Sequence, residues 1–402
     1  MKILFLANRL PYRDVAGGHR LVYQRMRQLK ARGHIIGLAA FAAHTDLEHI
    51  DELRAELDEL ETLPPKKQRL WVRVCHDYIN RWRPAIFWKN HSRGMMRLVG
   101  DMVERTQYDV VIAEYGEMGM YLYRNPYLSA VHKIVSCHRC LTTAFSKYIE
   151  TPGVPLSLRL KSATQVHILE RFEFEMYSAM DHILTLTQED RFTLLNHAPQ
   201  LPISVVHPGI DIEFLNRKTR VKPLHTQIMM CGYFADKSNH DAAVWFVEEI
   251  WPMVSRNHPH LRCCFVGEGM QPELKRLTDR MDSIYLIDWV DDLRPYRDQA
   301  AVFINPVRLG SGLRIKMLEA MASSLPVVTT SLGAASIPAQ NGVNCFIADT
   351  PELFAQSINW LIDDHKLAAA MGSEAKATVS AQHTIDTAVD ELEKILFEVV
   401  AS

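Results

Sequence analysis

Short apolar runs alternate with helical patterns along this chain of 402 residues. A short apolar run between turn signals is typical of a strand that is buried on both faces. Because helical patterns separate these runs, they predict parallel βαβ units with right-handed crossovers. A helix is expected from about His19 to Arg32. The predicted strands of this first series are Lys2–Ala7, Ile35–Phe41, Val110–Ala113, Lys133–Ser136 and Ile183–Leu186.

A second series of the same kind follows a loop region from Asn196 to Lys222 that is rich in Pro, Thr and basic residues. Its predicted strands are Gln227–Cys231, Cys263–Val266, Ser283–Ile287, Val302–Ile304 and Val327–Thr329, and its helices are Asp241–Asn257, Pro351–Asp364, Leu367–Gln382 and Asp386–Val400. The sequence therefore predicts an α/β protein with two doubly wound Rossmann-like domains, residues 1–218 and 219–385, and a closing helix over 386–402. A ligand cleft is expected between the domains, at the carboxyl ends of their strands.

Composition and charge restrict the class of protein. A content of 48% hydrophobic residues and a net charge of -2 describe a soluble globular chain and disfavour disorder or general nucleic-acid binding. The apolar run at the start is too short for a signal peptide, and no window approaches the ~20 apolar residues of a spanning helix. The 7 cysteines are odd in number and scattered, which fits a reducing cytosol. We therefore expect a cytoplasmic protein.

The segment from Gly310 to Ala322 predicts a glycine-rich turn that opens a helix. Arg314 and Lys316 lie at the start of this helix, where backbone amides and the helix dipole also attract anions. Glu319 follows about a turn and a half later, a position from which a carboxylate can accept hydrogen bonds from a ribose diol. Together these residues predict a site for a nucleoside diphosphate. The alternative for Glu319 is a solvated helix residue.

Further landmarks follow one another in the second predicted domain. They are Gly232, Asn239, Ala242–Phe246, Val266–Gly269, Asp288–Asp292 and Asn305–Arg308. Their order and spacing, together with Gly310–Ala322, resemble the GT-B-fold retaining glycosyltransferases of the glycosyl transferases group 1 type. The resemblance implies a sugar nucleotide as donor, held mainly by the second domain, and a glycan or lipid-linked sugar as acceptor. It also implies that the closing helix packs on the first domain.

The resemblance assigns several residues to the donor. It implies that Trp289 and Val290 contact the base, that Glu319 binds the ribose, and that the amides of Ser311, Gly312 and Leu313 hold the diphosphate. Residues assigned to further phosphate or backbone contacts are Gly17, Gly18, Arg20 and Gly232. Two alternatives stay open: a core aromatic for Trp289, and a plain turn for the Gly-Gly pair.

His138 follows a predicted strand and matches the position where such enzymes place a histidine that hydrogen-bonds the donor sugar. The alternative is a structural histidine. Cys137 and Cys140 form a C-x-x-C around it, but a zinc site normally needs four ligands and no second pair stands at matching spacing. The sequence therefore predicts no metal site here.

The chain departs from the pattern of the resembled family at two places. Ser311 stands where many members carry the first of two glutamates, so only Glu319 of that pair is present. Many members also carry an arginine just after the glycine that Gly232 matches, but here Tyr233 follows Gly232. Lys237 keeps the approximate place of the phosphate-binding lysine of the family. Arg314 and Lys316 are expected to supply the missing charge. Basic residues in the glycine turn resemble a subgroup that is linked to cell-surface polysaccharide assembly.

The resemblance also implies a mechanism. Retention would follow from front-face attack, in which the departing diphosphate takes the proton of the acceptor. His138, Lys237, Arg314 and Lys316 are the residues expected to assist, the last three by stabilising charge on the leaving phosphate. No Asp-x-Asp follows a first nucleotide-binding unit, and no carboxylate pair marks a hydrolase, so a transfer without metal or cofactor is expected.

A basic segment with interleaved aromatic residues spans residues 66–97, with nine Lys or Arg against the single acid Asp77. Such a segment fits an anionic membrane surface, which suits a lipid-linked acceptor and peripheral attachment at the inner face of the cytoplasmic membrane. It equally fits a solvated helical face or a groove for an anionic acceptor. Nucleic-acid binding is disfavoured, because no reader motif accompanies the segment.

Two alternative functions remain at this point. Ser311 and the missing arginine favour a non-catalytic protein that binds sugar nucleotides. A GT-B-fold epimerase would interconvert a sugar nucleotide with no acceptor present.

Overall fold

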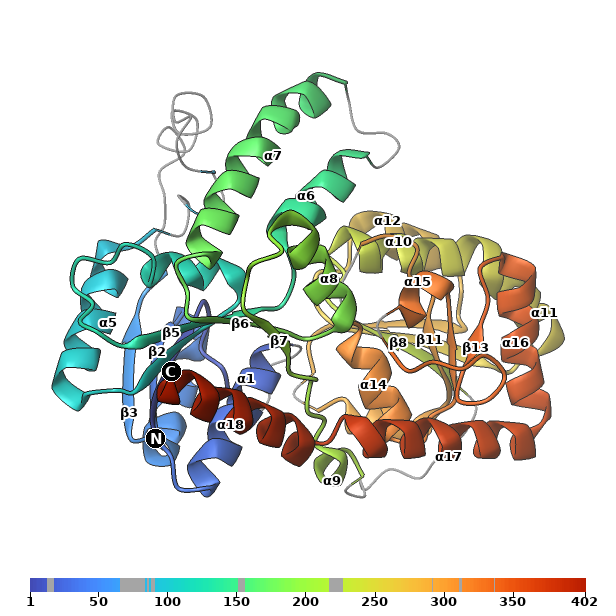
Figure 1. Ribbon diagram of the computed structural model, residues 1–402. Coiled ribbons are helices and arrows are strands. Elements are labelled where there is room, and N and C mark those ends of the chain that lie inside the picture. Colours follow the sequence, from blue (N-terminus) through green and yellow to red (C-terminus); the bar gives the residue numbers. More distant parts are fainter. Residues whose placement is uncertain are drawn as a thin grey trace. The chain divides into compact units, whose positions relative to one another are not determined.

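The structure is a computed structural model of the chain, and it divides into two compact units (Figure 1). Unit 1 comprises Met1–Gly209 and Ile385–Ser402, and unit 2 comprises Ile210–Thr384. The residues that the structure describes are 1–12, 18–65, 84, 87, 91–150, 156–216, 227–290, 292–310, 313–335 and 337–402.

Unit 1 is built on a seven-stranded parallel sheet with the order β3-β2-β1-β4-β5-β6-β7. Its strands are β1 (Lys2–Ala7), β2 (Ile35–Phe41), β3 (Glu59–Leu63), β4 (Val110–Glu114), β5 (His132–Cys137), β6 (His182–Thr185) and β7 (Ile203–Val205). All five strands predicted for this part are confirmed. Sequence analysis missed β3 and β7, which lie at the two edges of the sheet. Acidic residues at alternate positions interrupt the apolar pattern of β3, and β7 is only three residues long.

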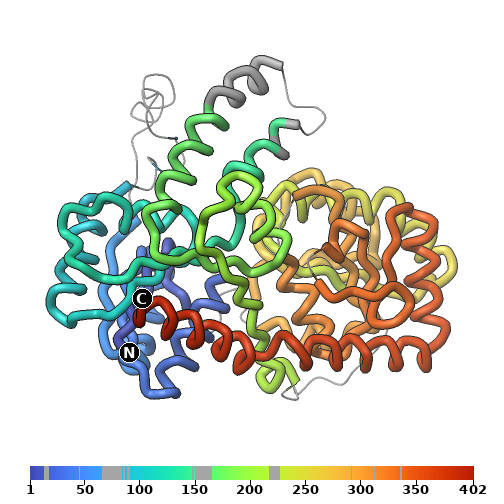
Figure 2. The backbone as a smooth tube through the Cα atoms, viewed as in Figure 1, coloured from blue at the N-terminus to red at the C-terminus, as the bar shows by residue number. Residues whose placement is uncertain are grey.

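Helices cover both faces of this sheet, and each face has its own apolar core. The helical elements are α1 (Gly18–Ala31), η1 (His44–His49), α2 (Ile50–Glu56), α5 (Arg93–Thr106), η2 (Gly116–Tyr121), α6 (Leu141–Glu150), α7 (Leu156–Tyr177), α8 (Gln188–His197) and α18 (Ile385–Ala401). Both chain termini belong to unit 1 (Figure 2). The C-terminal helix α18 packs against α1. Leu392 and Leu396 of α18 are fully buried in the core beneath it.

Unit 2 contains a six-stranded parallel sheet with the order β10-β9-β8-β11-β12-β13. Its strands are β8 (Gln227–Cys231), β9 (Arg262–Val266), β10 (Ile284–Ile287), β11 (Ala300–Asn305), β12 (Val327–Thr329) and β13 (Phe346–Ile347). Its helices are α9 (Ile212–Leu215), α10 (Lys237–Trp245), η3 (Phe246–Ile250), α11 (Trp251–Asn257), α12 (Pro272–Thr278), α13 (Arg294–Gln299), α14 (Ile315–Ala322), α15 (Ser331–Ala334), α16 (Pro351–Asp363) and α17 (His365–Gln382). Two Rossmann-like α/β units are thus confirmed.

The helix predicted over Asp241–Asn257 is not regular along its length. It starts earlier, as α10, passes through the π-helical segment η3, and continues as α11. Pro252 is the physical reason, because a proline has no amide hydrogen to donate to the preceding turn and its ring crowds that turn.

The division between the units falls at Gly209 and Ile210, before the 218/219 boundary expected from the sequence. Ile210 is buried in the core of unit 2, and its amide donates a hydrogen bond to the carbonyl of His383 at 2.7 Å. These contacts assign residues 210–216 to unit 2. The closing helix α18 belongs to unit 1, with its first residue at Ile385.

Both sheets reverse their strand order at one point. In unit 1 the reversal lies between β1 and β4, and in unit 2 between β8 and β11. Loops that leave the carboxyl ends of the two strands at such a point diverge to opposite faces of the sheet and leave room for a ligand. Among the described residues, no helix is both long enough and apolar enough to cross a membrane.

Candidate functional site

At the reversal point of unit 2, the N-termini of two helices are tied together. The loop after β8 leads into α10 at Lys237, and the loop after β11 leads into α14 at Ile315. The Ser238 hydroxyl donates to the carbonyl of Leu309 at 2.6 Å, and the Lys316 ammonium donates to Oδ1 of Asn239 at 2.7 Å. The amide ends and dipoles of two helices therefore lie at one edge of the sheet, an arrangement suited to phosphate.

Glycines allow the loops at this edge to approach one another closely. A Cβ atom on Gly267, which has φ +141, would lie 1.9 Å from the carbonyl oxygen of Gly232. A Cβ on Gly232 would lie 3.1 Å from the side chain of Asn239, and the same side chain donates to the carbonyl of Tyr233 at 3.0 Å. Gly232 and Gly267, both landmarks of the sequence, thus shape the loop that precedes α10.

Arg314 and Lys316 bring two partly buried cations to the start of α14. Burial lowers the pKa of Lys316 to about 8, with a contribution from the charge of Arg314. Burial also lowers the pKa of Arg314, whereas the charge of the Asp236 carboxylate acts to raise it. Arg314 donates from Nη2 to the carbonyl of Leu309 at 3.1 Å, while its buried Nε has no hydrogen-bond partner among the described residues. Two desolvated cations at helix N-termini favour an anionic ligand.

Glu319 lies one turn into α14 and is ion-paired with Arg297 of α13. The Nη2 atom of Arg297 is 2.6 Å from Oε2 of Glu319, and the two side chains are 3% and 12% exposed. The alternative of a solvated helix residue is therefore wrong. Sequence analysis missed Arg297, because only the tertiary structure shows its role. A buried guanidinium needs a carboxylate partner, and the partner of Arg297 lies 22 residues away in the chain.

The residues predicted to contact the base lie after β10 and differ in exposure. Trp289 is 43% exposed, so the alternative of a core aromatic is wrong, and Val290 is half-buried against the apolar cluster beneath the sheet. Tyr233, which follows Gly232, is 58% exposed. Lys237 is an exposed residue at the first position of α10. Leu313 is half-buried just before α14.

At the reversal point of unit 1, His138 forms part of a buried polar array. β4 ends at Glu114 and β5 ends just before His138, and neighbouring parallel strands bring these two ends together. The Nε2 atom of His138 is 2.9 Å from Oε2 of Glu114. Nη1 of Arg25 in α1 lies 3.4 Å from the other oxygen of Glu114 and 3.4 Å from the Ser136 hydroxyl. Sequence analysis missed Arg25 and Glu114.

The first turn of α1 lies against this array. A Cβ atom on Gly18 would come 2.6 Å from the Tyr115 hydroxyl and 3.1 Å from Nδ1 of His138, so a side chain at position 18 would displace them. The Tyr115 ring stacks on the imidazole of His138 with centroids 4.1 Å apart. Arg20 is half-buried in the same first turn of α1. The structure thus brings the predicted residues Gly18, Arg20 and His138 to one end of the sheet.

Several predicted features lie outside the described residues. They are Gly17, Ser311, Gly312 and most of the basic segment 66–97. Cys137 and Cys140 are described, and burial raises the pKa of both thiols. No group of three or more His, Cys, Asp or Glu side chains suited to a metal ion occurs in the part of the chain that the structure describes.

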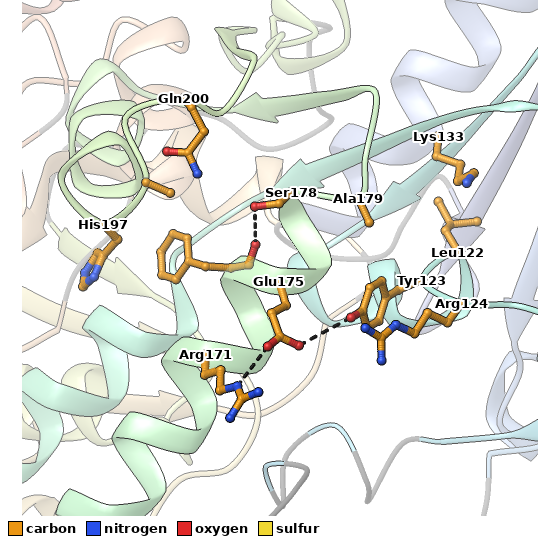
Figure 3. A pocket seen from close by; sticks show the side chains of 12 residues that line it. Leu122, Tyr123, Arg124, Lys133, Arg171, Glu175, Ser178, Ala179, His197 and Gln200 are labelled. Atoms are coloured by element: carbon orange, nitrogen blue, oxygen red, sulfur yellow. Dashed lines mark hydrogen bonds and ion pairs between the residues drawn. The ribbon is translucent and has the colours of Figure 1, made fainter.

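An open pocket in unit 1 lies elsewhere (Figure 3). Its lining includes Lys133 near the start of β5 and Ser178 and Ala179 just before β6, which places it at the amino edge of the sheet. Arg171 and Glu175, joined by a dashed line in Figure 3, are paired with each other at 2.9 Å. None of the residues predicted for the donor site lines this pocket.

Comparisons with known proteins find a family model that matches a part of unit 2. Residues 225–364 match the family model "Glycosyl transferases group 1". The matched residues lie in unit 2, so this unit resembles a glycosyl transferases group 1 domain. The chain is 24% identical over 373 residues to an "Uncharacterized 44.6 kDa protein in cps region" of Klebsiella pneumoniae, covering 89% of this chain and 90% of that one.

Solved structures share the fold of the chain over its length. Sucrose-phosphate synthase from Thermosynechococcus elongatus matches with a TM-score of 0.72 and 14% identity, covering 100% of both chains. Anabaena HepE, solved in complex with UDP and glucose, matches with a TM-score of 0.67 and 16% identity, covering 98% of this chain and 99% of that one. The chain therefore has the GT-B fold.

Proposed function

We propose that this protein is a glycosyltransferase that moves a sugar, with retention of its anomeric configuration, from a nucleoside-diphosphate sugar to a glycan or lipid-linked sugar. The observation that carries the proposal is the pair of partly buried cations, Arg314 and Lys316, at the start of α14, beside the N-terminus of α10. The proposal draws on the solved HepE complex with UDP and glucose for the class of donor.

The second unit would hold the nucleotide. Arg314 and Lys316, with Lys237 at the start of α10, would neutralise the diphosphate, and helix amides would donate hydrogen bonds to it. Glu319 would accept hydrogen bonds from the ribose diol while Arg297 keeps its carboxylate oriented. Trp289 and Val290 would contact the base.

The proposed chemical step needs no group beyond donor, acceptor and these side chains. The bond between the anomeric carbon and the diphosphate oxygen breaks, and a bond from the acceptor oxygen forms on the same face. The acceptor proton passes to the departing diphosphate oxygen. Lys237, Arg314 and Lys316 would stabilise the negative charge that develops there, and removing one such group would raise the barrier by ~3 kcal/mol. His138 would hydrogen-bond the donor sugar.

The proposal also covers the acceptor and the location of the enzyme in the cell. The Klebsiella pneumoniae relative "in cps region" supports a role in cell-surface polysaccharide assembly. We place the enzyme in the cytoplasm, at the inner face of the cytoplasmic membrane, if the basic segment 66–97 contacts anionic lipid. Vesicle sedimentation of Trp71→Ser, Trp82→Ser and Trp88→Ser variants tests that contact, and unchanged sedimentation would remove it.

The function is tested with purified protein and a panel of UDP, GDP and ADP sugars. We expect slow donor hydrolysis by one of them, transfer to a polysaccharide or lipid-linked acceptor, an unchanged anomeric configuration by NMR, and activity in EDTA. Lys316→Met should lower turnover about 100-fold while leaving affinity for the free nucleoside unchanged. Binding without turnover on any acceptor would favour the non-catalytic protein, and donor interconversion without acceptor would favour an epimerase.

A further inference from the structure

In unit 1, three ionisable side chains form a continuous buried chain. Arg25 and Glu114 are 3% and 0% exposed, and the side chain of His138 is 9% exposed. Their contacts run from Nη1 of Arg25 to Glu114 at 3.4 Å and from Glu114 to Nε2 of His138 at 2.9 Å. They come from α1, the end of β4 and the residue after β5, so the chain spans the reversal point of the sheet.

The surroundings of the carboxylate in the middle favour its ionised form. Burial alone would raise the pKa of Glu114, but the charge of Arg25 and the hydrogen bond from His138 lower it to about 2. The guanidinium of Arg25 makes its hydrogen bonds through Nη1, while its buried Nε and Nη2 have no partner among the described residues. Arg25 therefore acts on Glu114 mainly as a positive charge.

An ionised carboxylate can only accept hydrogen bonds, so Nε2 of His138 must carry a proton. In a neutral imidazole, Nδ1 is then the acceptor. Nδ1 faces the backbone of Gly18, where a Cβ would lie 3.1 Å away, and the ring is held from one side by Tyr115. The acceptor atom thus lies beside the glycine that begins α1.

We propose that Glu114 and Arg25 are positioning residues that fix His138 in its Nε2–H tautomer and present Nδ1 as the hydrogen-bond acceptor for a hydroxyl of the donor sugar. The inference rests on the proposed function for the identity of the ligand. It extends that function by naming which atom of His138 contacts the sugar and which side chains determine it.

Kinetics of a double-mutant cycle test the inference. We expect Glu114→Gln and His138→Ala each to lower kcat about 10- to 100-fold, the range for losing a hydrogen bond that involves a charged group, with little change in the KM of the donor. If Glu114 acts through His138, the double variant should be no slower than His138→Ala. Effects that multiply would overturn the inference, because they would show that Glu114 acts independently of His138.

Ring-nitrogen NMR on protein labelled with ¹⁵N-histidine gives a readout that needs no activity. His138→Ala identifies the signal, which should show the proton on Nε2 in the wild type and a mixture of tautomers in Glu114→Gln. A proton on Nδ1 in the wild type would overturn the inference. If the tautomer is as expected but no sugar is transferred, the proposed function fails and the positioning of His138 stands.

Glu173→Gln is the matched control. Glu173 is also a buried carboxylate of unit 1, but it accepts hydrogen bonds from the amides of Leu141 and Thr142 at the start of α6. Its replacement should lower the melting temperature and leave the His138 signal unchanged. Should Glu114→Gln not fold, Glu114→Asp keeps the charge and withdraws it from Nε2. Glu114→Asp should then shift the tautomer balance, and an unchanged signal would contradict the inference.

Discussion

Arg297 holds Glu319 in an ion pair of 2.6 Å beneath the start of α14, so the carboxylate predicted to bind the ribose has a fixed partner inside unit 2. The pairing orients the carboxylate of Glu319 and limits its rotation. A ribose hydroxyl would therefore meet an acceptor that is already oriented, which reduces the entropy lost on binding.

Glu319→Gln should weaken binding of the nucleoside diphosphate about 10-fold, because a charged acceptor is replaced by a neutral one. The 2′,3′-dideoxy form of the same nucleotide is the control ligand. It should bind equally to the wild type and the variant, since it offers no diol. Titration calorimetry measures both affinities. Equal weakening for the two nucleotides would show that Glu319 supports the fold of the site and does not contact the ribose.

Lys316→Met should stabilise the unliganded protein at pH 7 by on the order of 1–2 kcal/mol, because it removes a desolvated charge. The pKa of Lys316 is lowered to about 8 in the folded state, while an unfolded lysine titrates near about 10.4. Between these values the unfolded chain binds more protons, so wild-type stability rises with pH and the advantage of the variant shrinks. Urea unfolding at pH 7 and pH 10 checks this, and a pH-independent difference would contradict it.

Gly267→Ala should destabilise unit 2 by more than about 3 kcal/mol. The new Cβ would meet the Gly232 carbonyl at 1.9 Å, and the backbone has φ +141, which L-residues rarely adopt. Gly342→Ala is the control, since Gly342 has φ +76 but nothing within 4 Å, so it should cost only about 1 kcal/mol of backbone strain. Similar melting temperatures for the two variants would show that the loops can separate.

Glu391→Gln should lower stability more at pH 6 than at pH 8.5. The hydrogen bond to Glu391 of α18 raises the pKa of His207, whose Nδ1 is 2.9 Å from the carboxylate. A raised folded pKa gives stability that is present below the unfolded value of about 6.5 and is lost as the pH rises through the folded value. Thermal melts at the two pH values measure the difference, and an equal loss at both would remove the titration of His207 as its cause.

The strands and the order of the landmarks could be predicted from sequence because both are local. Apolar runs such as Gln227–Cys231 and Val327–Thr329 match β8 and β12 residue for residue. The edge strands β3 and β7 could not be found in this way. Each is held in the sheet by pairing with one neighbouring strand, and that pairing leaves no local pattern in the sequence.

The partners of the predicted site residues could not be read from the chain. Arg25 and Glu114 are separated by 89 residues, and Arg297 and Glu319 by 22. In sequence each looks like an ordinary charged residue of a helix or strand end. Only the fold shows that each arginine is buried against a carboxylate, and it is this burial that makes the pairs informative.

Unit 1 is assembled from two stretches of chain, because α18 supplies Val389, Leu392 and Leu396 to its core after all of unit 2 has been made. During synthesis, unit 2 can therefore reach its native packing first, while the part of the unit 1 core that α18 covers stays exposed. Until residues 385–402 leave the ribosome, that apolar surface is open to chaperones and to wrong partners.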